Sequence, residues 1–80
     1  MFYVYILQSI NFSEQTYVGY TNNLNKRLII HNSGLSNYTS MYMPWKIITY
    51  TAFTDQQKAI EFERYLKTSS GKVLLNRRLI

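Results

Sequence analysis

Hydrophobic and polar residues alternate at the start of the chain, which predicts a β-strand over residues 1–7. Each face of this strand carries three large side chains: Phe2, Val4 and Ile6 on one, and Tyr3, Tyr5 and Leu7 on the other. Residues 8–15 form a polar loop, and TYVGYT at 16–21 predicts a second strand. The short loop between them favours an antiparallel hairpin.

The residues after the hairpin have the spacing of apolar positions that predicts a helix. A first helix is expected over residues 22–32, with Thr21 as its cap and Gly34 at its end. Residues 35–44 are irregular and contain the only proline. The next segment, KIITYTAF at 46–53, is rich in β-branched and aromatic residues, which predicts a third strand.

Two more helices are expected in the remaining third of the chain. Thr54 and Gln57 have the spacing of a capping box, so a helix should run from Thr54 to about Lys67. The small residues 68–71 end it, and residues 72–79 predict a short final helix. The order ββαβαα predicts an α+β fold with a small three-stranded antiparallel sheet flanked by helices.

Length and composition narrow the class of protein. Eighty residues suffice for one domain and are too few for two, so residues 1–80 are expected to form a single domain. The chain has no cysteine, which excludes disulfides and thiolate metal sites. No segment has the pattern of a signal peptide or a membrane span, so a cytoplasmic location away from membranes is expected.

The net charge is +5, from nine basic and four acidic residues. Residues 64–80 contain no acid and five of the basic side chains: Arg64, Lys67, Lys72, Arg77 and Arg78. A segment of one sign indicates a polyanionic partner. A solvated basic surface explains the same charges equally well.

Some charged residues lie close to the apolar faces of the expected helices. At 100° per residue, Arg27 and His31 flank the apolar stripe of Leu24 and Leu28. An arginine stem along the core edge and a histidine at a helix end are the ordinary interpretations of these two residues.

The second helix offers a clearer contrast between two glutamates. Glu63 falls in the apolar sector between Ala59 and Leu66, whereas Glu61 points to the opposite side. A carboxylate in an apolar sector needs a cation or hydrogen-bond donors. A partly buried salt bridge, for instance to Arg27 or Arg64, and a metal ligand are both open interpretations for Glu63.

The spacing of several residues resembles the GIY-YIG nuclease family. Tyr3-Val4-Tyr5 corresponds to GIY and Tyr17-Val18-Gly19 to YIG. The segment TNNLNKRLIIHNSG is similar to the family's helix with arginine and histidine, and AIEFERYLK is similar to the helix with its glutamate. The resemblance covers residues 2–79. It is closest to short stand-alone bacterial proteins related to the N-terminal domain of the excinuclease C subunit.

The resemblance implies a metal-dependent endonuclease that hydrolyses phosphodiester bonds. It assigns catalysis to Tyr5, Tyr17, Arg27, His31 and Glu63, with Glu63 as the ligand of Mg²⁺ or Mn²⁺. The partner is expected to be nucleic acid, DNA rather than RNA, held by Gly19, Lys26, Lys67, Lys72, Asn76, Arg77 and Arg78. Gly19 is expected to leave room for a phosphate beside Tyr17. The alternative is a catalytically inactive nucleic-acid-binding module of the same fold.

Overall fold

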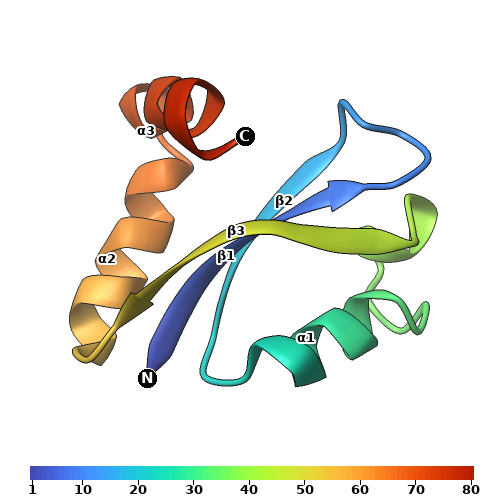
Figure 1. Cartoon of the computed structure of the whole chain (residues 1–80), viewed down its shortest axis with the longest axis horizontal. Coiled ribbons are helices and arrows are strands. Elements are labelled where there is room, and N and C mark those ends of the chain that lie inside the picture. The colour runs from blue at the N-terminus through green and yellow to red at the C-terminus, as the bar shows by residue number, and fades with distance from the viewer.

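The computed structural model describes all residues from 1 to 80. Its strands are β1 (Phe2–Ser9), β2 (Thr16–Thr21) and β3 (Trp45–Phe53), and its helices are α1 (Leu24–His31), α2 (Gln56–Leu66) and α3 (Ser69–Leu74). A 3-10 turn, Thr39–Met41, precedes β3, and a π-helical turn, Leu75–Leu79, continues α3. The α+β class and the order ββαβαα are therefore confirmed (Figure 1).

Strand β1 is the centre of the three-stranded sheet. The order is β2-β1-β3, and β1 is antiparallel to both neighbours. Tyr5 lies opposite Gly19 on β2 and opposite Tyr50 on β3. Because layers cover both faces of a central strand, both sets of alternating side chains are buried. Val4, Tyr5, Ile6 and Leu7 are each at most 2% exposed.

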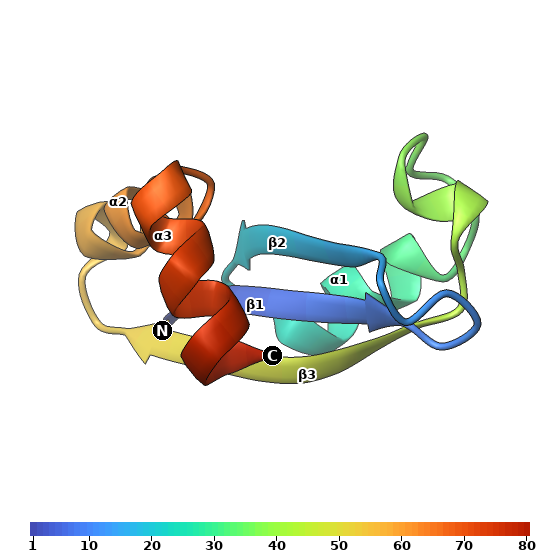
Figure 2. The same ribbon diagram turned by 90° about the horizontal axis from the view of Figure 1, so that it is seen from above.

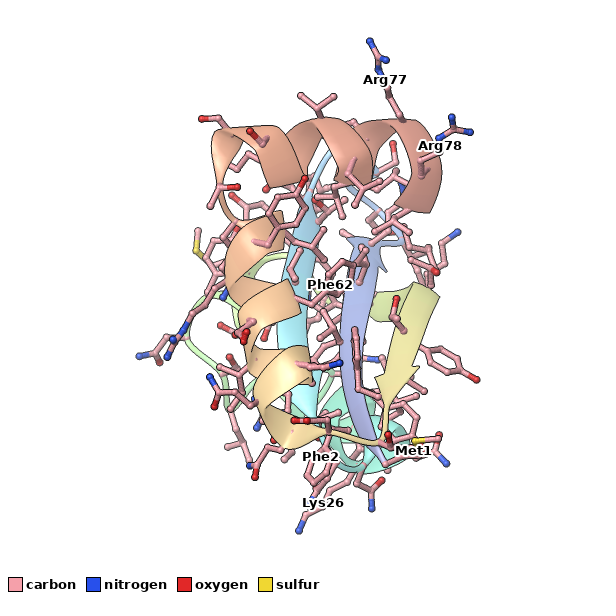
Figure 3. All side chains as sticks on the ribbon, turned by 90° about the vertical axis from the view of Figure 1, so that its left-hand side faces the viewer. Met1, Phe2, Lys26, Phe62, Arg77 and Arg78 are labelled. Carbon is pink, nitrogen blue, oxygen red and sulfur yellow. The ribbon has the colours of Figure 1, made fainter.

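The helices divide between the two faces of the sheet. In Figures 1 and 2, α2 and α3 lie together at one end of the molecule, and α1 lies on the other side of the strands. The α2 face has a core of Val4, Ala59 and Leu66. Figure 3 shows Phe62 pointing from α2 toward the strands, and its ring packs against that core. The α1 face has a second core, built on Tyr5, Leu7 and Trp45.

Both expected helix caps were wrong by one or two positions. Asn23, not Thr21, caps α1, because its side chain accepts the Lys26 N–H. Thr21 is a buried residue of β2 whose hydroxyl accepts the Asn23 N–H. Asp55, not Thr54, caps α2. A carboxylate held at the positive end of a helix, accepting two backbone N–H groups, explains that preference.

The last helix begins earlier than the sequence pattern indicates. Thr68 caps α3 through the Gly71 N–H, so residues 69–71 are helical and do not form a linker. Gly71 is buried, and a Cβ there would overlap the backbone carbonyl of Tyr65. Glycine therefore allows the start of α3 to lie directly against the end of α2. The preceding helix does end near Lys67, as expected.

None of the helices has the length and apolar character needed to cross a membrane.

Candidate functional site

A buried hydrogen-bonded chain connects three segments on the α1 face of the sheet. The Tyr5 hydroxyl of β1 lies 2.8 Å from Nε2 of His31, the last residue of α1. Nδ1 of His31 lies 2.9 Å from the hydroxyl of Thr39. The three residues are 1%, 1% and 0% exposed. Since both ring nitrogens have partners, the orientation of the imidazole is fixed.

Trp45 anchors the far end of this chain. Its indole N–H donates to the Thr39 carbonyl oxygen at 2.7 Å. The side chain of Asn32, just after α1, holds the Trp45 backbone by accepting its N–H at 2.6 Å and donating to its carbonyl at 3.1 Å. These hydrogen bonds attach the start of β3 to the end of α1 and hold Thr39 in contact with His31.

The buried pair of Tyr5 and His31 is uncharged at neutral pH. Burial lowers the pKa of His31, and the positive charge of Arg27 lowers it further. Burial raises the pKa of Tyr5, although the Arg27 guanidinium opposes this effect. A neutral imidazole donates from one nitrogen and accepts at the other. The direction of its hydrogen bond with Thr39 therefore determines the direction of its hydrogen bond with Tyr5.

Tyr17 of β2 completes an aromatic cluster with these residues. Its ring centroid lies 4.9 Å from that of His31 and 6.4 Å from that of Tyr5. Unlike Tyr5, it is only half-buried and lines a cleft of about 360 Å³ at the outer edge of β2. Tyr17 is therefore the tyrosine of the cluster that faces a space large enough for a ligand.

Arg27 brings a positive charge to the same face. Its charge affects the pKa of both Tyr5 and His31, so the guanidinium lies near both. The buried Nε–H has no hydrogen-bond partner within the protein. A buried donor without an acceptor is costly, so this Nε–H is a destabilising feature of the fold. Arg27 also lines a hollow of about 500 Å³ together with Lys26 and Asn22.

Glu63 approaches the cluster from α2, at the edge of the sheet. Its side chain is 22% exposed, and its charge contributes to the raised pKa of Tyr5. The salt-bridge partner is Lys67, one turn away at 3.2 Å, and neither Arg27 nor Arg64. Exposed pairs with this spacing stabilise by only about 0.3–0.5 kcal/mol, so the carboxylate can change partner easily. Glu61 is exposed, as expected.

The donor set around Glu63 fits one kind of metal ion. No group of three or more His, Asp or Glu side chains is placed to hold a metal. Both nitrogens of His31 are already hydrogen-bonded within the protein. A single carboxylate matches Mg²⁺, which keeps several waters and uses one or two carboxylates together with substrate phosphates. It does not match zinc, which needs several protein ligands.

The expectation that Gly19 leaves room for a phosphate was wrong. Gly19 is buried, and a Cβ built on it would overlap the hydroxyl end of Tyr5. The space above this glycine is therefore filled by the Tyr5 ring from the neighbouring strand. Gly19 supports the site by allowing Tyr5 to reach His31, and its surface is not available to a ligand.

The basic residues expected to hold nucleic acid do not form one surface. Lys67 and Lys72 line the cleft with Tyr17, whereas Lys26 lines the hollow beside Arg27. Arg77 and Arg78 point outward from the C-terminal turn, at the opposite end from Lys26 (Figure 3). Asn76, in the same turn, is exposed.

The sequence pattern missed three residues that shape the site. Thr39, Trp45 and Tyr38 lie in or beside the irregular segment, where neither helical nor strand periodicity gives a signal. Trp45, which lies just before the predicted third strand, is 2% exposed and is the first residue of β3. The tryptophan alone could have given a hint, because so large a side chain in a small protein is usually buried.

Comparisons with known proteins agree with this arrangement. The sequence profile of the GIY-YIG catalytic domain matches residues 1–77. A UPF0213 protein of Clostridium perfringens is 40% identical over 68 residues, which are 84% of this chain and 71% of that protein. One from Streptococcus pneumoniae serotype 4 is 38% identical over 66 residues, 81% of this chain and 65% of that protein. This chain thus spans roughly two thirds of the length of these relatives.

A solved structure supports the same assignment. The solution NMR structure of a UPF0213 protein from Bacillus halodurans superposes with a TM-score of 0.55 at 30% sequence identity. The match covers 95% of this chain and 83% of that one. The resemblance carried by Tyr17-Val18-Gly19 and the following helix is thereby confirmed. The chain belongs to the GIY-YIG nuclease family.

Proposed function

We propose that this protein is a metal-dependent endonuclease that hydrolyses phosphodiester bonds of nucleic acid, with DNA as its substrate. One observation carries the proposal. Tyr5, Tyr17 and His31, which come from β1, β2 and α1, form one cluster, and Arg27 lies close enough to affect the pKa of two of them. A core needs no such convergence of polar groups, whereas phosphodiester hydrolysis does.

Arg27 is assigned to the phosphate. Hydrolysis places extra negative charge on the non-bridging oxygens, and a guanidinium can donate to two oxygens at once. The hollow of about 500 Å³ that Arg27 lines supports this role, because it gives a phosphate room to reach the guanidinium. Lys26 lines the same hollow and would add positive charge beside the phosphate backbone of the nucleic acid.

Tyr17 is assigned to the attacking water. It faces the cleft, whereas the Tyr5 hydroxyl is directed to His31. Tyr17 would orient the attacking water by a hydrogen bond from its hydroxyl. Tyr5, whose pKa is raised, stays a phenol and keeps the neutral His31 in place. His31 and Tyr5 therefore position the reacting group and hold protons within the buried chain.

Glu63 is assigned to the metal ion. A divalent cation, Mg²⁺ or Mn²⁺, would supply positive charge at the phosphate and at the leaving oxygen when bound. For this, Glu63 must exchange its contact with Lys67 for the ion, and the weakness of that exposed pair makes the exchange easy. The fit of one carboxylate to Mg²⁺ supports this part of the proposal.

The test is a cleavage assay on supercoiled, branched and single-stranded DNA and on RNA. Products should appear with Mg²⁺ or Mn²⁺ and disappear with EDTA. Salt-sensitive binding without cleavage under every condition would select the alternative, an inactive binding module. In that case the logarithm of the binding constant for duplex DNA should fall with log salt by about 0.9 per phosphate contacted.

A further inference from the structure

The cleft beside Tyr17 has features that the catalytic roles above do not use. It lies along the outer edge of β2, with Leu66, Lys67, Lys72 and Leu75 on one side. Tyr38, from the segment between α1 and β3, lines the other side. In Figure 2, α2 and α3 and the loop that carries Tyr38 stand on either side of β2. The cleft is therefore built from parts far apart in sequence that meet only in the folded chain.

Tyr38 gives this cleft an exposed aromatic wall. Its ring centroid lies 6.0 Å from that of Tyr17, with 33° between the ring planes, and 6.1 Å from that of Tyr42. Yet 49% of its surface remains exposed. Tyr38 packs against the rings of Tyr17 and Tyr42, and the rest of its surface is accessible to a flat ligand. Aromatic side chains held in this way are platforms on which nucleobases stack.

Charge makes the same cleft suitable for a nucleotide. Lys67 and Lys72 line it, and no acidic residue does. Apolar side chains, including Leu66 and Leu75, also line it. A nucleotide within a strand combines a base, whose flat faces stack, with a phosphate on either side. The walls of the cleft match that combination.

We propose that the cleft binds the base of the nucleotide next to the cleaved phosphodiester, stacked on Tyr38, with its phosphates paired to Lys67 and Lys72. A volume of about 360 Å³ lies at the lower end of the range for small-molecule sites and gives room for a base. The base must leave its stack to enter. The position relative to the cleaved bond rests on the proposed function through Tyr17, whereas binding of the base itself does not.

Binding to two short oligomers of equal length, in EDTA so that nothing is cut, tests the base contact. One is oligothymidylate and the other is an abasic deoxyribose oligomer with the same phosphates. The wild-type protein should bind oligothymidylate about tenfold more tightly, because stacking is lost without bases. Tyr38→Ala should abolish this preference and Tyr38→Phe should keep it. Tyr50→Ala removes a comparably exposed tyrosine from β3, away from the cleft, and should also keep it.

The lysines are tested by salt dependence with the same oligomers. Lys67→Ala and Lys72→Ala should weaken binding to both oligomers alike, and each should reduce the slope against log salt by about 0.7. Lys58→Ala, an exposed lysine of α2 that does not line the cleft, should leave the slope unchanged. Unchanged slopes for both cleft lysines would overturn their assignment to the phosphates.

The outcomes also separate this inference from the proposed function. Equal affinity of the wild-type protein for the two oligomers, or a preference that survives Tyr38→Ala, would overturn the base site even if the protein cuts nucleic acid. A preference that depends on Tyr38 in a protein that cuts nothing with Mg²⁺ or Mn²⁺ would support the base site and overturn the nuclease.

Discussion

The two faces of the sheet are built by different physical means. The α2 face joins Val4, Ala59 and Leu66 by apolar contact, which has no preferred direction. The α1 face joins Tyr5 and His31 to Thr39 by hydrogen bonds, which fix distances and angles. The first face can accept new side chains of similar volume. The second cannot lose one polar group without leaving another unpaired.

This difference indicates where function and stability reside. If the proposed function holds, substitutions on the α1 face should change catalysis by large factors, and those on the α2 face should change stability alone. Glu63 is the exception that makes the comparison informative, because it belongs to α2 and yet lies near Tyr5.

The largest effect is expected from Glu63→Gln, which should abolish metal-dependent cleavage. A neutral amide is a poor ligand for a hard cation. Thermal melts in EDTA should show almost no change, since only an exposed pair with Lys67 is lost. Glu61→Gln, on the exposed side of the same helix, is the matched control and should cut normally. If Glu63→Gln also cuts normally, Glu63 is no exception to the division between the two faces, and the metal ligand must lie elsewhere.

Arg27→Ala should reduce the cleavage rate by about 10²–10³. The buried Nε has no partner within the protein, and the Tyr5 hydroxyl that Arg27 contacts keeps its hydrogen bond with His31, so the fold should persist. Arg27→Lys should restore little, because an ammonium cannot donate to two phosphate oxygens in a fixed plane. Single-turnover rates together with circular dichroism would check both points. A fully active Arg27→Ala would assign this residue to packing.

The two tyrosines should separate catalysis from structure. Tyr17→Phe should lower the rate more than Tyr5→Phe, because Tyr17 lines the cleft whereas the Tyr5 hydroxyl is bonded to His31. Tyr5→Phe leaves a nitrogen of His31 unpaired, which should cost about 1–3 kcal/mol of unfolding free energy. Urea unfolding and cleavage rates of both variants are the measurements. Full activity in the double variant would remove both hydroxyls from the mechanism.

Ile6→Val tests the apolar face through the same central strand. Ile6 is 2% exposed and adjoins Tyr5 in sequence, but its side chain points to the opposite side of the sheet. Loss of one methylene should lower the unfolding free energy by about 0.5–1.5 kcal/mol. Cleavage per folded molecule should stay the same. A large drop in that activity would show that the two faces are coupled through β1.

The smallest effect concerns pH. The pKa of His31 in the folded protein lies below its ordinary value of 6.5, so the unfolded chain binds the proton more readily. The contribution of His31 to stability is therefore complete above about pH 6.5 and is lost as the pH falls from there toward the folded pKa. Melting temperatures across this range should fall more steeply for the wild-type protein than for His31→Gln. Parallel curves would contradict a neutral, buried imidazole.

The sequence was sufficient to predict the elements but not all of their junctions. All three strands and both long helices were predicted, because their periodicity reflects which side chains are buried. The caps were misassigned because Thr21 and Asn23, like Thr54 and Asp55, are all residue types that cap helices, although Asn and Asp rank above Thr. Which one caps is decided by where the preceding strand or turn ends, a property of the tertiary structure.

The candidate site was predicted in part for a related reason. Tyr5 and His31 were identified through the family resemblance, and they do contact each other. Their partner Thr39 could not be identified, because a threonine in an irregular segment has no periodic signal. The cleft could not be predicted either, because Tyr38 and Lys72 are distant in sequence and line one cleft only in the folded chain.

The packing of Tyr5 over Gly19 has an evolutionary consequence. The two tripeptides that give the family its name lie on neighbouring strands and are paired only through their last residues, Tyr5 and Gly19, where the Tyr5 ring covers the glycine. Each position sets the size allowed at its counterpart. A lineage that gained a side chain at position 19 could keep a functional fold only by shrinking or re-aiming the residue at position 5. Residues 5 and 19 should therefore vary together among relatives.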